Sequence, residues 1–370
     1  MNFEFSDEQN LLREQARGFL EQNCQPKAVR AVLEGEESYD YALWDKIIEM
    51  GWTSAVIPEE FGGLGLSYLE LSVISEELGR VCAPVPFSST VYLLTEAILA
   101  SGSNAQKEYW LPKLAEGKVI GCLALIEREG QPTETNIHVK FDEGNLSGTK
   151  LLVTDGDIAD LGVVFARDKV GVSAYLVDLN QKGITRKRIS TIDPTRSHAK
   201  IHFEEVESEL LGEEGKGWKL LEEIYNRAAV LFAWEQIGGS ESALNMAKEY
   251  ALGRFAFGRP IGSYQAIKHK LAHAYVKNTL ARSNCYYGSW ALSNDAPELA
   301  VAAAAARISA TQAYYYAAKE NIQTHGGMGF TWEFDCQFPY RRSKLLAVNI
   351  GNEYWWQDRL ISAIENERSA

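Results

Sequence analysis

The sequence predicts an α+β protein whose helices and strands are segregated along the chain. Apolar residues recur at helical intervals in residues 1–117, short β-branched runs separated by turn residues fill 118–211, and helical periodicity returns in 212–370. Because helices and strands do not alternate, the pattern favours an N-terminal helical domain (1–117), a central antiparallel β domain (118–211) and a C-terminal helical domain (212–370). A dinucleotide-binding Rossmann fold, which is built from βαβ units, is not expected.

Composition and charge exclude several classes of protein. The 370 residues are 46% hydrophobic and 24% charged, and no apolar run approaches the roughly 20 residues that span a bilayer. A formal net charge of −13 argues against nucleic acid or an anionic membrane as a partner. Residues 1–8 lack the basic and apolar regions of a secretory signal, and the five cysteines show no Cys-x-x-Cys spacing. We therefore expect a cytoplasmic protein without disulfides or a bound metal.

The N-terminal part carries helical signals with one interruption. Ser6 and Gln9 have the spacing of a capping box, which predicts that a helix begins after Ser6. Further helices are expected over residues 41–50 and 67–81. Residues 58–65 (PEEFGGLG) lie between them, and their glycines predict a connector that is not helical.

The central part has the pattern of short strands, and the C-terminal part that of long helices. Turns are predicted at 142–145 and 155–157, and the glycines within 212–217 mark the end of the β domain. Ser263 is predicted to cap a helix, and residues 298–323 predict an alanine-rich one. The expected strands are 120–125, 137–141, 151–154, 161–166, 173–177 and 201–203.

Residues 254–265 (RFAFGRPIGSYQ) form the clearest chemical cluster. Arg254 can hold a phosphate through a bidentate, charge-assisted fork, and Phe257 offers a flat face to a planar ring. The glycines allow a ligand to approach the backbone closely. A phosphate-bearing aromatic ligand fits this segment. The alternative is a plain helix end, in which the arginines compensate the helix dipole and Pro260 and Gly262 stop the helix.

Residues 323–331 (QTHGGMGFT) form a second cluster directly after the alanine-rich helix. Three glycines in four positions leave backbone N–H groups exposed, which suits a pyrophosphate or the edge of a flavin. The alternative is a helix-ending turn capped by His325. That alternative explains one glycine well and three poorly.

Together these segments resemble the acyl-CoA dehydrogenases, flavoproteins that oxidise the Cα–Cβ bond of acyl-CoA thioesters. The resemblance extends, in the same order along the chain, to residues 58–65 (PEEFGGLG), 76–80 (EELGR) and 211–218 (LGEEGKGW). It implies a helical N-terminal domain, a β domain and a C-terminal four-helix bundle. It also implies FAD between the β domain and the bundle, reaching a neighbouring subunit, with acyl-CoA as substrate and an electron-transfer flavoprotein as electron acceptor.

The resemblance implies roles for individual residues. Arg254 and Phe257 would hold the pyrophosphate and adenine side of the partner subunit's FAD, with Gln265 nearby. Thr154 matches the family's threonine near flavin N5. The adenosine and pyrophosphate path of the same partner-borne FAD would be lined by Gln323, Gly326 and Gly327.

Two departures from the family's pattern concern the flavin. The family's Thr-Glu-Pro-Gly loop corresponds here to residues 125–130 (LIEREG). Ile126 stands in place of the hydroxyl residue, so we expect one hydrogen bond to the flavin to be missing. The tryptophan that often covers the flavin is replaced by Leu152.

A third departure concerns the carboxylate that takes the α-proton in the family. Alignment on residues 359–361 places Asn352 at its usual position, and the position used by some members on an earlier helix, beside Arg227, is Asn226. A neutral amide does not accept that proton. Glu353 is the candidate displaced base, although one residue along a helix turns a side chain by about 100°. The alternative for Glu353 is a solvated carboxylate at a helix end.

Residues 351–359 (GNEYWWQDR) resemble a subgroup associated with steroid side-chain degradation. In that subgroup the region has the pattern Gly-Asp-x-x-His-His, and two different subunits form a heterotetramer. This chain lacks the Asp and the histidines of the subgroup. Its tryptophan pair, Trp355 and Trp356, is also typical of a core or interface anchor.

The sequence leaves four functions open. The first is a working acyl-CoA dehydrogenase in which Glu353 is the base. The second is a non-catalytic or half-site subunit of a heteromeric dehydrogenase, which supplies Arg254, Phe257 and the 323–331 loop to a partner's FAD. The third is a flavin monooxygenase of the same fold, which needs no α-proton base. The fourth, a helical scaffold without cofactor, is disfavoured because the flavin segments are retained. The assembly is expected to be a homo-oligomer or a heterotetramer.

Overall fold

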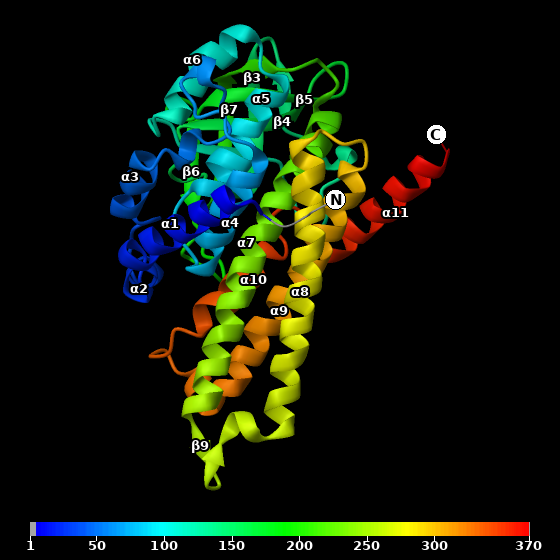
Figure 1. Cartoon of the computed structure of the whole chain (residues 1–370). Coiled ribbons are helices and arrows are strands. Elements are labelled where there is room, and N and C mark those ends of the chain that lie inside the picture. Colours follow the sequence, from blue (N-terminus) through cyan, green and yellow to red (C-terminus); the bar gives the residue numbers. More distant parts are fainter. Residues whose placement is uncertain (1–4, 370) are drawn as a thin grey trace. The chain divides into compact units, whose positions relative to one another are not determined.

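The computed structural model describes residues 5–369, and their contacts divide the chain into two compact units (Figure 1). The bundle unit comprises residues 5–30, 68–83 and 229–369, and the sheet unit comprises residues 31–67 and 84–228. Each unit is assembled from segments that lie far apart in the sequence. The division into three domains at 117 and 211 stays a prediction. The prediction that residues 1–8 are not a secretory signal falls partly on residues 1–4, which lie outside the described residues.

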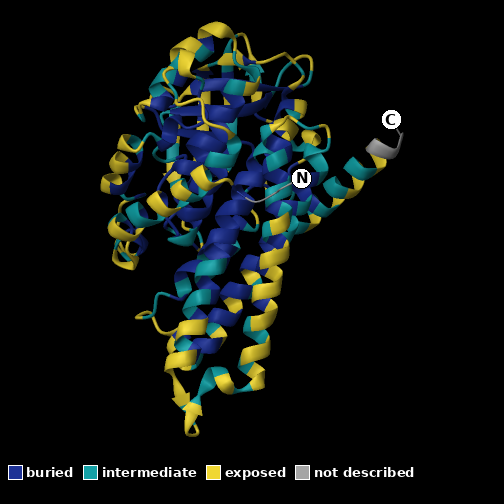
Figure 2. Cartoon of the chain, viewed as in Figure 1, coloured by how far each residue is buried: buried dark blue, intermediate teal, exposed yellow. Residues whose placement is uncertain are grey.

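Long helices form the bundle unit. α8 (Gln265–Ser293) and α9 (Leu299–His325) lie beside the C-terminal part of α7 (Gly217–Gly253), and the hairpin of β9 (Phe255–Ala256) and β10 (Arg259–Pro260) joins α7 to α8 (Figure 1). Figure 2 shows that this hairpin is largely exposed, whereas the parts of the helices farther from the hairpin carry many buried residues. Within residues 5–369, no helix combines the length and apolar character needed to cross a membrane. The other helices are α1 (Asp7–Asn23), α4 (Tyr68–Arg80), α10 (Gln337–Leu346), α11 (Glu353–Ser369) and α2 (Pro26–Glu34), which continues into the sheet unit.

Two glycines let α4 and α7 approach closely within the bundle unit. A Cβ built at Gly79 would lie 1.9 Å from the backbone oxygen of Glu235, and one at Gly238 would lie 1.8 Å from that of Glu76. A side chain at either position would force the two helices apart, because backbone atoms leave no room for it. The family-like stretch at residues 76–80 therefore serves helix packing.

A buried ion network joins α4 to its neighbours in the bundle unit. The carboxylate of Glu76, 1% exposed, lies 2.7 Å from Arg282 on α8 and 3.2 Å from Arg80. Glu77 accepts two hydrogen bonds from the guanidinium of Arg17 on α1. Burial by itself raises the pKa of Glu76, but the neighbouring guanidinium groups, that of Arg282 first, outweigh burial and bring this pKa below its ordinary value.

Glu76→Gln is expected to lower the free energy of unfolding by about 3–5 kcal/mol, because the arginines lose the buried carboxylate that they share. Glu241→Gln is the matched control: its carboxylate contacts Arg80 and Arg282 but is 38% exposed, so the expected loss is below about 1 kcal/mol. Urea unfolding at neutral pH measures both, and equal losses would contradict the account. Since the pKa of Glu76 is lowered, its contribution is complete above about pH 4.5 and is lost as the pH falls through the lowered pKa.

The sheet unit is built on one sheet, with strand order β6–β7–β3–β2–β4–β5–β8 and β1 beside β4. Pairing is antiparallel except at β4, which runs parallel to β1 and, through one residue pair, to β2. The strands are β1 (Gly121–Ala124), β2 (Lys140–Asp142), β3 (Asn145–Thr154), β4 (Leu161–Arg167), β5 (Val172–Asp178), β6 (Ile184–Arg188), β7 (His198–Glu207) and β8 (Glu209–Leu211). The unit also holds α3 (Tyr41–Glu49), the π-helix η3 (Ser88–Thr95), α5 (Glu96–Ser101) and α6 (Asn104–Ala115).

Local signals predicted some element ends correctly and others not. The capping box at Ser6 is confirmed, with Gln9 N donating to Ser6 Oγ and Ser6 N donating to Gln9 Oε1. The predicted cap at Ser263 is wrong: its hydroxyl donates to the Pro260 oxygen at 2.7 Å, and α8 begins at Gln265 after the 3₁₀ turn η5 (Ile261–Ser263). The Ser263 hydroxyl is engaged by this nearby backbone carbonyl, and it does not cap the first turn of α8.

Two strands of the sheet unit were not predicted, and one began later than expected. β6 (ITRKR) is charged and β8 (ELL) has only three residues, and both lie at the edges of the sheet, so neither shows the apolar alternation that marks a strand in sequence. Residues 137–139 precede β2 as an extended segment, after a 3₁₀ turn at Glu134–Asn136.

Candidate active site

The first predicted cluster forms a hairpin at the end of α7. α7 ends at Gly253, and β9 and β10 turn back on each other through Phe257 and Gly258, whose φ angles are +49° and +80°. Such positive angles are typical of a tight two-residue hairpin turn. The Phe257 ring is 97% exposed. Arg254 and Gln265, the first residue of α8, are also exposed.

The second predicted cluster lies at the same end of the bundle unit. The ring of His325, the last residue of α9, stacks on Tyr250 near the end of α7, with 4.1 Å between centroids. Tyr250 in turn accepts a backbone hydrogen bond from Arg254 at 2.8 Å. The structure therefore brings together two clusters about 70 residues apart in sequence. The His325 ring therefore packs α9 against α7, which differs from the exposed capping residue of the alternative interpretation.

The glycine-rich turn after α9 leaves its backbone open. Gly326 has a φ angle of +59°, and a Cβ built at Gly326 or Gly327 would meet nothing within 4 Å in the described part of the chain. Gln323 is exposed on the last turn of α9. An open glycine backbone, the exposed guanidinium of Arg254 and the exposed ring of Phe257 fit the phosphates and the flat ring of FAD.

β3 of the sheet unit carries a bulge at the predicted flavin position. Its pairing with β7 shifts register between Lys150 and Val153, and Leu152 has a φ angle of +51° and is 51% exposed. A bulky residue at positive φ is strained, and bulges re-aim side chains beside active sites. The strand then places Thr154 opposite His198, with 3.1 Å between Thr154 Oγ1 and His198 Nε2.

A buried ion pair fixes the loop that contains Ile126. Lys150 is fully buried and donates to the carboxylate of Glu127 at 2.6 Å and to the Leu125 oxygen at 3.0 Å. Glu127 also accepts a hydrogen bond from His138 N at 2.7 Å. Burial lowers the pKa of Lys150 to about 8, against the opposing effect of Glu127. The loop is therefore held by its own charges, and the Ile126 side chain offers a flavin no hydrogen bond.

Asn352 and Glu353 have different roles at the start of α11. Asn352 Oδ1 accepts a hydrogen bond from Trp355 N at 3.0 Å, as a helix cap does. Glu353 Oε1 accepts hydrogen bonds from Gln312 Nε2 at 2.6 Å and from Gln357 Nε2 at 3.0 Å. The amide at the usual base position therefore serves the helix end, whereas the neighbouring carboxylate reaches α9.

Asn352 and Glu353 both line a pocket of about 370 Å³ in the bundle unit. Its lining surface is largely apolar and includes Tyr315, Tyr316 and Val348, although Lys277 and Lys344 also line it. Glu353 thus brings a carboxylate to a largely apolar hollow, the kind of setting in which ligands are bound. Its partner Gln312 lies 11 residues before Gln323 on α9, roughly 16 Å of helix rise. The candidate base and the glycine-rich turn therefore mark two separate places on the bundle unit.

The second amide, Asn226, lies in the sheet unit beside a buried ion pair. Its neighbour Arg227 donates from Nε to Glu96 Oε2 at 3.0 Å, and Glu96 is 1% exposed at the start of α5. The π-helix η3 ends directly before Glu96, and π-helical turns occur frequently at functional sites. Glu96 is a carboxylate that the sequence did not single out.

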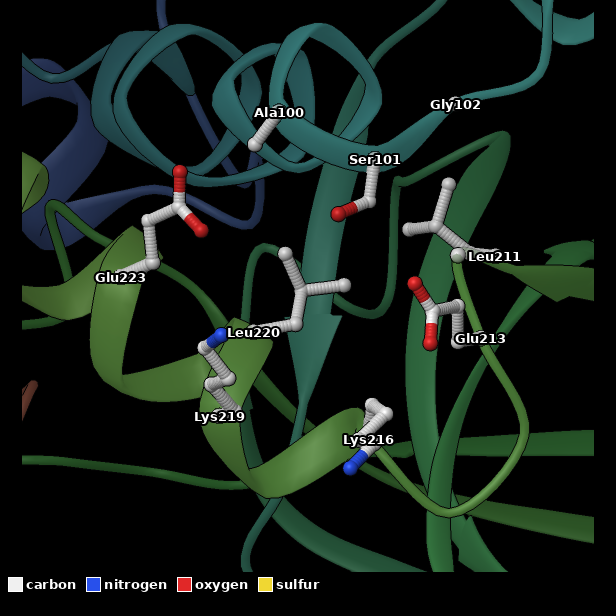
Figure 3. Close-up of a pocket in the computed structure, with 10 residues that line it drawn as sticks. Ala100, Ser101, Gly102, Leu211, Glu213, Lys216, Lys219, Leu220 and Glu223 are labelled. Atoms are coloured by element: carbon white, nitrogen blue, oxygen red, sulfur yellow. The ribbon is translucent and has the colours of Figure 1, made fainter.

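An open pocket of about 470 Å³ is shown in Figure 3. Two of its lining residues lie about one helical turn along the chain from the members of this ion pair. The pocket is lined by Ala100, four residues after Glu96, and by Glu223, four residues before Arg227. Figure 3 shows side chains from α5, from α7 and from the segment after β8 gathered around it. None of the sequence-predicted site residues lines this pocket.

Two residues in these settings, Glu96 and His198, were missed by sequence reasoning. Glu96 stands in an apolar helical stretch, where a single carboxylate between Thr95 and Ala97 was the available signal. His198 is one of six histidines, and its pairing with Thr154 depends on a strand register that includes a bulge. A sequence pattern does not specify that register.

Comparison with known proteins identifies the family. Residues 6–118 match the model of the acyl-CoA dehydrogenase N-terminal domain, and residues 215–355 match that of the acyl-CoA dehydrogenase C-terminal domain. The acyl-CoA dehydrogenase IpdE2 of Mycobacterium tuberculosis is 34% identical over 340 residues, which cover 91% of each chain.

Solved structures share the fold over nearly the whole chain. Butyryl-CoA dehydrogenase from Megasphaera elsdenii superposes with a TM-score of 0.91 at 28% identity, covering 98% of this chain and 100% of that one. The Tcur3481–Tcur3483 steroid ACAD gives a TM-score of 0.89 at 26% identity, covering 98% and 99%. The members of the matched family are FAD-binding oxidoreductases that act on CH–CH groups, which confirms the predicted fold, cofactor and enzyme class. The chain belongs to the acyl-CoA dehydrogenase family.

Proposed function

We propose that this chain dehydrogenates an acyl-CoA thioester at Cα–Cβ to give the 2,3-enoyl-CoA, and that an electron-transfer flavoprotein receives the electrons. The observation that carries the proposal is the carboxylate of Glu353, held by two glutamine amides in the largely apolar pocket of the bundle unit. A carboxylate oxygen is able to accept a proton, which the amides at Asn352 and Asn226 are not. The flavin segments of both units support the same function.

The proposed roles divide between proton removal and cofactor binding. Glu353 Oε takes the α-proton of the thioester. FAD, when bound, supplies the acceptor for the β-hydride. Thr154 and Leu152 of β3 lie at the flavin face of the sheet unit. The remaining residues hold the FAD of a neighbouring subunit, so the enzyme works as an oligomer: Arg254, Phe257, Gln265, Gln323, Gly326 and Gly327.

The substrate class and the compartment are proposed from separate observations. The likeness to the Tcur3481–Tcur3483 steroid ACAD favours an acyl-CoA with a steroid-derived chain. The five cysteines, which all lie within the described residues, are buried and form no disulfide, which fits the reducing cytoplasm.

The proposal predicts that the purified chain, loaded with FAD and given an artificial electron acceptor, converts acyl-CoA to 2,3-enoyl-CoA. Mass spectrometry of the CoA esters measures the loss of two hydrogens from the acyl chain. Short, long and steroid-derived thioesters should be compared, since the pocket does not specify the chain. Absence of enoyl-CoA from all three classes would rule the proposal out for the chain alone.

A second candidate function is a half-site subunit of a heteromeric dehydrogenase. Asn352 and Asn226 favour it because both usual base positions carry amides, and Ile126 favours it because the flavin loop lacks its hydroxyl group. Under this alternative, the chain purified alone holds no flavin. It regains flavin and activity when co-expressed with a second acyl-CoA dehydrogenase subunit. A flavin-to-chain ratio near one for the chain alone would contradict it.

A further inference from the structure

One cross-strand pair in the sheet unit joins the predicted flavin threonine to a histidine. Thr154 of β3 and His198 of β7 are direct partners in the antiparallel register, and their Oγ1 and Nε2 atoms are 3.1 Å apart. Directly opposed residues share one face of a sheet, which places their side chains in contact. The pair directly follows the strained bulge at Leu152.

His198 is buried on a face of β7 that is otherwise exposed. Alternation along the strand puts His198, Lys200 and His202 on one face, and Ala199 and Ile201 on the other. Lys200 and His202 are exposed, whereas His198 is only 4% exposed. The titratable ring of His198 is therefore buried at the position of β7 that is paired with Thr154.

Burial, rather than the charged groups around it, favours the neutral form of the His198 ring. Asp155 and Arg196 form a buried ion pair at 2.8 Å, so their charges oppose each other at the ring. Asp193, the third charged neighbour, accepts a hydrogen bond from Thr195 N. Burial is the strongest influence and lowers the pKa of His198 below its ordinary value.

The partners of the two ring nitrogens fix the tautomer of His198. Nδ1 lies 3.1 Å from the backbone oxygen of Arg196, and a carbonyl only accepts, so Nδ1 carries the hydrogen. In a neutral ring, Nε2 is then bare and only accepts. The Thr154 hydroxyl therefore donates to Nε2, and the lone pairs of Thr154 Oγ1 remain for a different donor.

We propose that His198 is a positioning residue that holds the Thr154 hydroxyl oxygen as a hydrogen-bond acceptor toward the flavin. The inference rests on the proposed function in one respect, the place of Thr154 near flavin N5. N5 carries a hydrogen in the reduced flavin and none in the oxidised flavin. An oxygen that only accepts therefore favours the reduced form, and His198 raises the reduction potential of the bound FAD.

The first test measures the tautomer in the unaltered protein. Nitrogen-15 NMR of histidine-labelled protein distinguishes the ring nitrogens, and the signals lost in His198→Gln assign this residue. We expect a neutral ring with its hydrogen on Nδ1 at neutral pH. A ring protonated on Nε2, or on both nitrogens, overturns the proposal. This readout requires neither acyl-CoA nor turnover.

The second test measures the midpoint potential of FAD bound to the oligomer. His198→Phe removes the acceptor, so the Thr154 hydroxyl becomes able to donate to oxidised N5. We expect the equilibrium to shift toward oxidised flavin by about tenfold, which is about 30 mV for a two-electron couple. His198→Gln keeps an acceptor oxygen and should retain the potential of the unaltered protein.

His202→Phe is the matched control for that measurement. Thr149 and His202 form the same kind of pair on the same two strands, 2.9 Å apart, but His202 is exposed. The control should leave the potential unchanged. An unchanged potential in His198→Phe, or an equal shift in His202→Phe, overturns the proposal.

The outcomes separate this inference from the proposed function. A protein that shows the expected tautomer and potential shift but forms no enoyl-CoA supports the role of His198 and contradicts the dehydrogenase proposal. An active dehydrogenase with the other tautomer supports the proposed function and overturns the role of His198.

Discussion

Glu353→Gln is expected to slow the reduction of bound flavin by acyl-CoA about 10²- to 10⁴-fold, the usual contribution of a positioned general base. The side chain keeps its size and its hydrogen-bonding reach to Gln312 and Gln357, so FAD should remain bound. What it loses is the ability to accept the α-proton. Stopped-flow absorbance of the flavin band, under anaerobic conditions, gives the rate constant directly.

Asp358→Asn is the control for this substitution. Asp358 is exposed on the same helix, α11, so the variant removes the same charge without touching the pocket. Its reduction rate should equal that of the unaltered protein. If Glu353→Gln also reduces its flavin at the unaltered rate, Glu353 is not the base, and Glu96 becomes the next carboxylate to test.

Arg254→Ala is expected to weaken the binding of FAD about 10- to 100-fold, because a charge-assisted hydrogen bond contributes about 1.5–3 kcal/mol. The exposed guanidinium belongs to the residue that directly follows α7. The stacking of His325 on Tyr250 holds the open glycine turn at the same end of the bundle unit. Titration of the flavin-free protein with FAD measures the dissociation constant. If the site is shared between subunits, the loss of affinity should be accompanied by a less stable oligomer.

Arg259→Ala provides the comparison on the same hairpin. The guanidinium of Arg259 lies over the ring of Tyr264 at 4.0 Å, so it is already engaged within its own chain. It should therefore change FAD affinity much less than Arg254→Ala does. Equal losses for both arginines would mean that the hairpin attracts FAD only through its total positive charge.

Much of the fold was readable from sequence because its signals are local. The capping box at Ser6, the alanine-rich helix α9 and the segregation of helices and strands each depend on neighbouring residues, and the structure confirms them. The Ser263 cap failed for a local reason as well, since a carbonyl three residues earlier competes for its hydroxyl. The charged strand β6 has no apolar alternation to reveal it.

The candidate site was only partly predictable because its parts meet through tertiary structure. The hairpin residues and the glycine-rich turn were each visible in sequence, but the stacking of His325 on Tyr250 that brings them together was not. The contact between Glu353 and Gln312 joins α11 to α9 across 41 residues, and the pairing of Thr154 with His198 follows a bulge. Side chains that meet in this way leave no periodic trace in the sequence.

The most direct test of the central claim is an anaerobic titration of the FAD-loaded chain, purified alone, with acyl-CoA thioesters. We expect the flavin absorbance to bleach to completion with at least one of the short, long or steroid-derived thioesters, and enoyl-CoA to form in equal amount. Persistence of the oxidised flavin spectrum with every thioester, in protein that holds FAD, would contradict the claim that this chain is itself a dehydrogenase.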